Sequence, residues 1–251
     1  MRKVTRALVP LAAAAVPFAL MAAPAHADSG WQLQATLNPL NHSSGSGMAT
    51  VTGTGNQAHV TVHWSGLAAK FNGAAYPHVQ HIHIAGQGQC PTAAADKNGD
   101  GVISTTEGGP AYGGIGTTLS VKGDTSPKAA TDIKIAPGGG STSYSRDITL
   151  SNDTLNSLKA GTAVVVVHGL DPATLSKKAQ NEKSDLVPSL PLAATSPALC
   201  GVLSAMPSGG VATGTGSTAG VEDLGLLAAG GGLAALGGGL LVARRRQTVK
   251  A

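Results

Sequence analysis

The chain has 251 residues, of which 42% are hydrophobic and 12% are charged, with 35 glycines, 14 prolines and 2 cysteines. This length and composition fit one or two folded domains and exclude both a disordered chain and a disulfide-rich mini-protein. The formal net charge is +4, but seven of the 17 basic residues lie at the two ends of the chain, and the stretch between them has a net charge of −3. Because a phosphate-binding surface needs clustered Lys and Arg, nucleic acid is not expected as a partner.

The first 27 residues have the pattern of a secretory signal peptide. Basic residues at positions 2, 3 and 6 precede an apolar run over residues 7–23, which is followed by Ala25-His26-Ala27. A basic start, an apolar middle and a small-residue cleavage motif are typical of such signals, and two prolines inside the run argue against a membrane-spanning helix. We therefore expect residues 1–27 to be removed on export.

The C-terminal end predicts a transmembrane helix. Residues 224–243 carry no charge and are followed by Arg244-Arg245-Arg246. A helix of this length, at about 1.5 Å per residue, spans the roughly 30 Å hydrocarbon layer, and the arginines place residues 244–251 in the cytoplasm. Residues 206–223 are rich in Gly, Ser and Thr and predict a flexible stalk. This end resembles that of actinobacterial wall-anchored surface proteins, so we expect residues 28–205 to be extracellular and tethered to the membrane or cell wall.

The stretch from residue 28 to residue 205 predicts an all-β domain. Hydrophobic residues occupy every second position over residues 31–37 and 60–64, and residues 164–167 form a valine run that suits a strand buried on both faces. Clusters of Gly, Asn, Asp and Pro separate these runs. One short helix is expected over residues 153–160, with Asn152 as its cap and Gly161 at its end. Several strands with long loops indicate a β-sandwich or a Greek-key barrel.

The only two cysteines, Cys90 and Cys200, predict a disulfide. An exported chain meets an oxidising compartment, and two cysteines allow a single pairing. The alternative is a pair of free thiols on the cell surface.

Residues 96–107 match the twelve-residue calcium loop of EF-hand proteins at every ligand position. The ligands would be Asp96, Asn98, Asp100, the Val102 carbonyl, Ser104 and Glu107. Gly108-Gly109-Pro110 follow directly and predict that the usual exit helix is missing. The alternative is a polar turn that binds no ion. We expect a weak calcium site, with Kd about 10⁻⁴ to 10⁻³ M and a structural role.

Three histidines predict a transition-metal site. On a strand, His81 and His83 project to the same face, where two imidazoles can hold one copper ion. His168 ends the valine run and is the candidate third ligand. The histidines at positions 59 and 63 are expected to be exposed, and His78 is out of phase with the pair.

The order of these motifs resembles that in the Cu/Zn superoxide dismutases and in the chordin-type domains that share a similar Greek-key sandwich. His81-Ile82-His83 precedes Cys90 by a few residues, residues 165–168 read Val-Val-Val-His, and Leu199-Cys200-Gly201-Val202 closes the domain. The resemblance covers roughly residues 31–204. It implies that His81, His83 and His168 are copper ligands and that Cys90 and Cys200 form the bridge.

The chain departs from the dismutase pattern in two places. In the dismutases the loop after the first cysteine carries the bridging histidine and the zinc ligands, whereas residues 91–167 contain no histidine here, so zinc is not expected. The family's substrate-guiding Arg lies three residues before the second cysteine, where this chain has Pro197. Loss of that cation removes both the attraction and the positioning of superoxide.

Three functions are consistent with these features. The first is a surface-tethered metal-binding domain of dismutase-like fold, which binds calcium through residues 96–107 and copper through the three histidines. The second is an active copper-dependent superoxide dismutase. The third is a chordin-type module that binds an extracellular ligand and whose histidines only hydrogen-bond the backbone. We favour the first.

Overall fold

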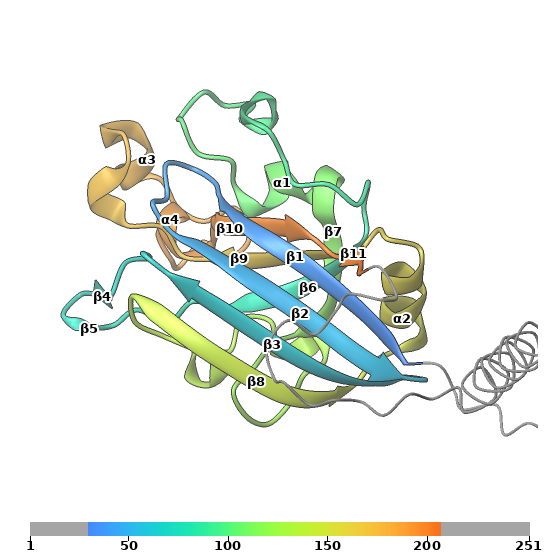
Figure 1. Cartoon of the computed structure of the whole chain (residues 1–251). Helices are drawn as coiled ribbons and strands as arrows, with labels where there is room; N and C mark the ends of the chain where they lie inside the picture. Colours follow the sequence, from blue (N-terminus) through green and yellow to red (C-terminus); the bar gives the residue numbers. More distant parts are fainter. Residues whose placement is uncertain (1–29, 207–251) are drawn as a thin grey trace, which may run out of the picture. The chain divides into compact units, whose positions relative to one another are not determined.

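The computed structural model describes residues 30–206, which are dominated by antiparallel strands (Figure 1). The strands are β1 (Trp31–Pro39), β2 (Ser46–Thr54), β3 (Gln57–Ser65), β4 (Lys70–Phe71), β5 (Ala74–Ala75), β6 (Gln80–Ala85), β7 (Gly113–Thr118), β8 (Ser141–Thr149), β9 (Val164–His168), β10 (Pro197–Val202) and β11 (Ser204–Ala205). The α-helices are α1 (Thr105–Tyr112), α2 (Asn152–Lys159), α3 (Lys177–Asn181) and α4 (Leu192–Thr195), and short 3-10 turns cover Ala93–Ala95, Pro127–Ala129, Ile133–Ile135 and Pro172–Thr174.

One antiparallel sheet contains nine of these strands and curls into a half-barrel. Its order is β7-β6-β9-β10-β1-β2-β3-β8, with β11 paired to β1, and β4 and β5 form a separate hairpin. The chain runs from β1 to β2 and β3 as a meander, and then crosses to β6 on the far side of β9 and β10. This crossover brings residues near position 80 beside residues near position 168.

The predicted alternation of faces is confirmed in the strands. Leu33, Ala35 and Leu37 of β1 are buried, as are Val60 and Val62 of β3. Their side chains join one main core on the inner face of the curled sheet. Residues between them point to the opposite, solvent-facing side because successive side chains alternate along a strand.

Strand β9 is buried on both faces, as the valine run predicts. Val165 and Val167 belong to the main core, whereas Val164 and Val166 belong to a second cluster with Tyr112 and Cys200. The sheet is therefore covered on its outer face as well at this point. His168 has the same parity as Val164 and Val166, so its side chain lies on this covered outer face.

The helices differ from the sequence prediction in two respects. Helix α2 is present, but its cap is Ser151 and not Asn152, since the Ser151 Oγ accepts the Thr154 N–H at 3.1 Å. Helix α1 was not expected, because Gly108-Gly109-Pro110 lie inside it. The prediction that no exit helix follows residues 96–107 is therefore wrong.

Capping explains why α1 forms despite its glycines and proline. The Ser104 hydroxyl accepts the Glu107 N–H, and the Glu107 carboxylate accepts the Ser104 N–H, which together make a capping box. Pro110 removes one backbone donor, but the helix ends only two residues later at Tyr112, so little of the hydrogen-bond ladder is lost. Tyr112 is buried in the second cluster and anchors this end.

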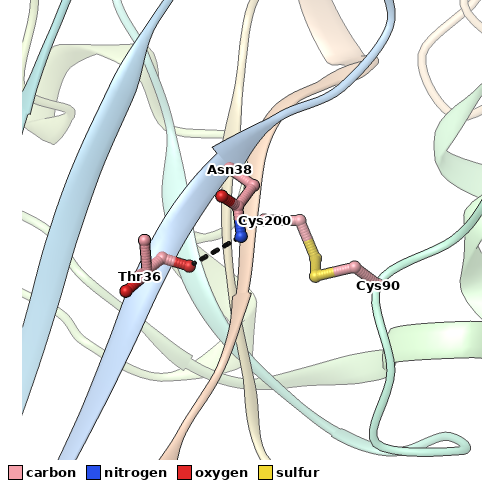
Figure 2. Close-up of a disulfide and its surroundings, with 4 residues drawn as sticks. All are labelled: Thr36, Asn38, Cys90 and Cys200. Carbon is pink, nitrogen blue, oxygen red and sulfur yellow. Dashed lines mark hydrogen bonds between the residues drawn. A yellow bond between two sulfur atoms is a disulfide. The ribbon is translucent and has the colours of Figure 1, made fainter.

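The predicted disulfide between Cys90 and Cys200 is present (Figure 2). It joins the segment that follows β6 to strand β10, across a sequence separation of 110 residues and a Cα–Cα distance of 5.8 Å. Cys200 pairs with Asn38 in the sheet register, and the Asn38 side-chain amide donates to the Thr36 carbonyl on β1. The bridge thus ties the 86–112 segment, which includes α1, to the centre of the sheet.

The predicted signal peptide (residues 1–27) and transmembrane helix (residues 224–243) lie outside the described residues, as does the stalk apart from Met206. Within residues 30–206, no helix has the length and hydrophobicity needed to span a membrane.

Candidate metal centre

Strand pairing between β6 and β9 brings three histidines together. In this antiparallel register His81 lies opposite Val166 and His83 lies opposite Val164. His168 is two residues beyond Val166 on the same face, which makes it the diagonal neighbour of His81. One ring nitrogen from each of the three histidines lies within 4.8 Å of the other two. The predicted convergence of these residues, distant along the chain, is therefore confirmed.

A backbone carbonyl orients each of the three rings. The His81 Nε2 contacts the Ala130 carbonyl at 3.0 Å, the His83 Nδ1 contacts the Gly113 carbonyl at 2.9 Å, and the His168 Nδ1 contacts the Thr195 carbonyl at 2.6 Å. A carbonyl oxygen only accepts hydrogen bonds, so the proton of each neutral ring must sit on the nitrogen that faces it. The tautomer of every ring is thereby fixed, and the lone pair lies on the other nitrogen.

The three remaining nitrogens have no hydrogen-bond partner. They are the His81 Nδ1, the His83 Nε2 and the His168 Nε2, and all three are buried. The side chains are only 2–3% exposed, so water does not satisfy them freely. A buried polar atom without a partner is rare and needs an explanation. Three such atoms on neighbouring rings have the donor chemistry that a transition metal ion takes, so the group could hold one.

The pKa values of the three rings favour the neutral form that a metal requires. Burial lowers the pKa of His83 to about 3 and that of His168 to about 4, with the neighbouring His168 adding to the effect at His83. Burial also lowers the pKa of His81 well below its usual range, helped by the proximity of His168 and His83. At neutral pH all three lone pairs are therefore available without loss of a proton.

Helix α1 encloses the centre on one side through Tyr112. The Tyr112 ring lies edge-on to the His83 ring with centroids 4.6 Å apart, and its hydroxyl donates to the Thr105 carbonyl at 2.8 Å. The residue after it, Gly113, supplies the carbonyl that holds His83. Tyr112 is not among the predicted site residues. In the sequence it is only an aromatic residue shortly after Gly108-Gly109-Pro110, and this pattern does not indicate a metal centre.

The other histidines lie where the sequence predicts. His59 and His63 are exposed on the outer side of β3. The His59 Nδ1 lies 2.7 Å from the Asp147 carboxylate and its Nε2 lies 3.1 Å from the Ser145 hydroxyl. His78 is buried outside the trio, and its two ring nitrogens face the carbonyls of His168 and Ala68 at 2.9 Å each. His78 therefore packs against the end of β9, and neither of its ring nitrogens is free to bind a metal.

The carboxylates of residues 96–107 are occupied by the backbone of their own loop. Asp96 accepts the N–H groups of Gly99 and Gly101 at 2.8 and 2.9 Å, and Asp100 accepts the Val102 N–H at 2.6 Å. Glu107 serves the capping box of α1. Over residues 30–206, the histidine trio is the one group of three or more His, Cys, Asp or Glu side chains that converge at ligand distance. The structure therefore gives the calcium prediction no support.

Two acidic residues outside the ligand pattern contact this loop: Asp185, which accepts the Thr106 N–H at 3.1 Å, and Glu182. Glu182, directly after α3, lies against the Asn98 amide and the Asp100 carboxylate. The hydrogen bond with Asp100, together with partial desolvation, raises the pKa of Glu182 above its ordinary value. No sequence pattern links Glu182 to a loop more than seventy residues earlier, because α3 reaches it only through the tertiary fold.

A scan against protein-family models gives no match, and a search of curated proteins finds no similar sequence. The described residues form a mostly antiparallel sheet, curled into a half-barrel, that carries a three-histidine group and a disulfide. This arrangement is compatible with a superoxide dismutase-like fold, and the histidine group could bind a transition metal such as copper.

Proposed function

We propose that this protein is an exported, cell-surface-tethered domain of superoxide dismutase-like fold that holds one copper ion. The ligands are the His81 Nδ1, the His83 Nε2 and the His168 Nε2. The observation that carries the proposal is the set of three buried nitrogens without hydrogen-bond partners, on clustered rings whose opposite nitrogens contact backbone carbonyls. Export and tethering rest on the patterns at the two ends of the sequence.

Copper is favoured by the ligand type and by the affinity order of divalent metals. Imidazole suits copper, zinc, iron and nickel, and a given nitrogen site binds Cu²⁺ more tightly than Zn²⁺. Carbonyl partners on the second ring nitrogens are the outer-shell contacts that hold a metal-binding imidazole in one orientation. A bound copper ion would supply one-electron redox chemistry. The residues of the chain itself would fix the three donors and keep water away from them.

The surroundings of the trio favour metal binding over fast catalysis. The three side chains are only 2–3% exposed, so little of their surface is open to a substrate anion. Pro197, which occupies the place of the substrate-guiding Arg in the dismutase resemblance, pairs with His168 in the sheet register and is buried. An active copper-dependent dismutase is the alternative. The chordin-type alternative, with purely structural histidines, leaves the three unpartnered nitrogens without an explanation.

The test is copper binding by the full-length protein with a matched pair of double variants. His81→Ala/His83→Ala removes two proposed ligands, whereas His59→Ala/His63→Ala removes two exposed imidazoles from β3, which is not adjacent to β6 or β9 in the sheet. We expect one copper per chain in the wild type and in the second variant. Copper affinity should fall by more than about a hundredfold in the first, since loss of even an outer-shell partner costs about 10- to 100-fold. Equal copper uptake by the two variants contradicts the proposal.

A superoxide dismutation assay on the copper-loaded protein separates the binding domain from its enzymatic alternative. We expect one copper per chain with slow turnover. Diffusion-limited turnover that disappears in His81→Ala/His83→Ala would instead establish the dismutase. Calcium binding by residues 96–107 remains a separate proposal, supported by the sequence pattern alone.

A further inference from the structure

A cleft of about 430 Å³ lies beside the metal centre. It is bounded by the β4–β5 hairpin, the approach to β6, residues 131–134 and residues 187–195. Its mostly apolar lining includes Phe71, Ala75, Tyr76, Lys134, Val187 and Leu190. This volume falls within the range of pockets that bind small molecules, about 300–1,000 Å³.

The lining combines an apolar wall with a single charge. The rings of Phe71 and Tyr76 stack with centroids 5.0 Å apart and planes at 27°. Aliphatic side chains from Val187 and Leu190 complete the wall. Lys134 is the only charged residue of the lining, and its ammonium forms no ion pair with any carboxylate among residues 30–206. An apolar body with one anionic group is the ligand that complements this arrangement.

We propose that this cleft binds a small aromatic carboxylate. The ring would pack against the partly exposed Phe71, which the buried Tyr76 supports from behind, because aromatic rings favour offset or edge contacts with one another. The carboxylate would lie at the rim, where it pairs with Lys134. An aliphatic acid of similar size makes the same ion pair but loses the ring contacts.

The cleft shares structural elements with the metal centre. Thr195 lines the cleft, and its carbonyl holds the His168 Nδ1. Thr131 lines it as well, and the preceding Ala130 carbonyl holds the His81 Nε2. A ligand in the cleft therefore contacts the two segments that orient two of the three metal ligands. Because these segments are shared, we expect the ligand and the metal to change each other's affinity, and reciprocity makes the factor the same for both; this coupling rests on the proposed function.

The binding test uses 2-naphthoate, titrated by calorimetry into the metal-free full-length protein. We expect saturable binding with one site. Ala75→Trp should fill the cleft and abolish binding, and Lys134→Met should weaken it about three- to fivefold, as expected for a partly exposed ion pair. Lys128→Met, which removes a lysine outside the cleft, should leave binding unchanged. No binding to the wild type, or equal binding to Ala75→Trp, overturns the proposal.

Two analogues test the ligand class. The neutral 2-naphthalenemethanol should bind more weakly than 2-naphthoate in the wild type and equally well in Lys134→Met. Octanoate should bind at least about threefold more weakly than 2-naphthoate, since ring contacts add about 0.5–1.5 kcal/mol. Tighter binding of octanoate overturns the aromatic assignment.

The coupling is measured as the copper affinity with and without saturating 2-naphthoate. We expect a change of at least about threefold in the wild type and none in Ala75→Trp. Unchanged copper affinity in a protein that binds both molecules refutes the coupling. If 2-naphthoate binds but copper does not, the proposed function fails while the cleft assignment stands.

Discussion

The histidine trio and the 96–107 loop both present metal-binding side chains, but they differ in what those side chains contact. In the trio, backbone carbonyls occupy one nitrogen of each ring and leave the other nitrogen free. In the loop, backbone N–H groups occupy the carboxylates of Asp96, Asp100 and Glu107. The first arrangement leaves donor atoms unsatisfied and the second does not.

The difference teaches that a ligand pattern and a prepared ligand site are separate properties. His81, His83 and His168 lie on two paired strands, and hydrogen bonds from outside the strands hold their rings. The three rings are therefore oriented before any metal binds. The carboxylates of the 96–107 loop keep lone pairs beside their hydrogen bonds, since each offers about four acceptor sites, but they do not converge as the histidines do. The following predictions set the two regions against each other.

The largest expected effect at neutral pH comes from the disulfide that ties the loop segment to the sheet. Cys90→Ser/Cys200→Ser should lower the free energy of unfolding by about 4–5 kcal/mol in the chain-entropy account of a loop of this length. Urea denaturation of the oxidised wild type and the variant measures this loss. Copper affinity of the folded variant should stay within about threefold of wild type, because the pairing of β7 with β6, and not the bridge, holds the Gly113 carbonyl against His83. A large loss of copper affinity on removal of the disulfide would show that the 86–112 segment positions the three histidines.

Copper itself should stabilise the protein by about 4 kcal/mol when its free concentration is about a thousand times Kd. Thermal or urea unfolding with and without copper measures the shift. His83→Ala should reduce it to about 1.4 kcal/mol or less at the same copper concentration, because loss of one of the three donors raises Kd about a hundredfold or more. Asp96→Asn should keep it in full, because the 96–107 loop contributes no donor to the trio. Loss of the shift in Asp96→Asn would mean that the two regions form one site.

The stability of the metal-free protein should depend on pH through the buried histidines. Because burial lowers the folded-state pKa of His83 to about 3 and of His168 to about 4, the unfolded chain binds more protons than the folded one below the ordinary value of 6.5. Stability of the metal-free protein is therefore complete above pH 6.5 and falls as the pH drops toward 4, by up to about 1.4 kcal/mol per pH unit for each ring.

The control for this pH effect is His83→Gln, followed by urea denaturation between pH 7 and pH 4. The variant should show a shallower loss of stability, because it lacks one of the buried titrating rings. His63→Gln, which removes an exposed histidine, should follow the wild-type curve. An identical pH dependence in all three proteins would contradict the assigned cause.

The sequence predicts the strands and the trio because both follow from the two-residue period of a strand. That period places Val60 and Val62 in the core, and it places His81 and His83 on one face. The order of motifs in the dismutase resemblance then brings His168 to the same point. The carbonyls that orient the rings belong to Ala130, Gly113 and Thr195. They could not be predicted from the sequence, because every residue has a carbonyl and only the tertiary fold determines which of them face the rings.

Helix α1 shows how one sequence pattern can serve two structures. Ser104 and Glu107 occupy two ligand positions of a calcium loop, and the same three-residue spacing makes a capping box. The low helix propensity of Gly108-Gly109-Pro110 led to the prediction that no helix follows, and the capping box of Ser104 and Glu107 was not recognised. Local hydrogen bonds and the burial of Tyr112 outweigh the low helix propensity of these residues.

The smallest expected effect belongs to calcium. If residues 96–107 bind it with the Kd of about 10⁻³ M that the sequence pattern suggests, a calcium concentration of about twice Kd stabilises the protein by only about 0.6 kcal/mol. Differential scanning calorimetry of the full-length protein should show a small rise in melting temperature that Asp96→Asn removes and Asp147→Asn, at an exposed carboxylate outside the loop, retains. A melting temperature that does not respond to calcium would leave Ser104 and Glu107 with capping as their role, and the ligand pattern of the loop would then be a by-product of the cap and of turn-forming Asp and Asn residues.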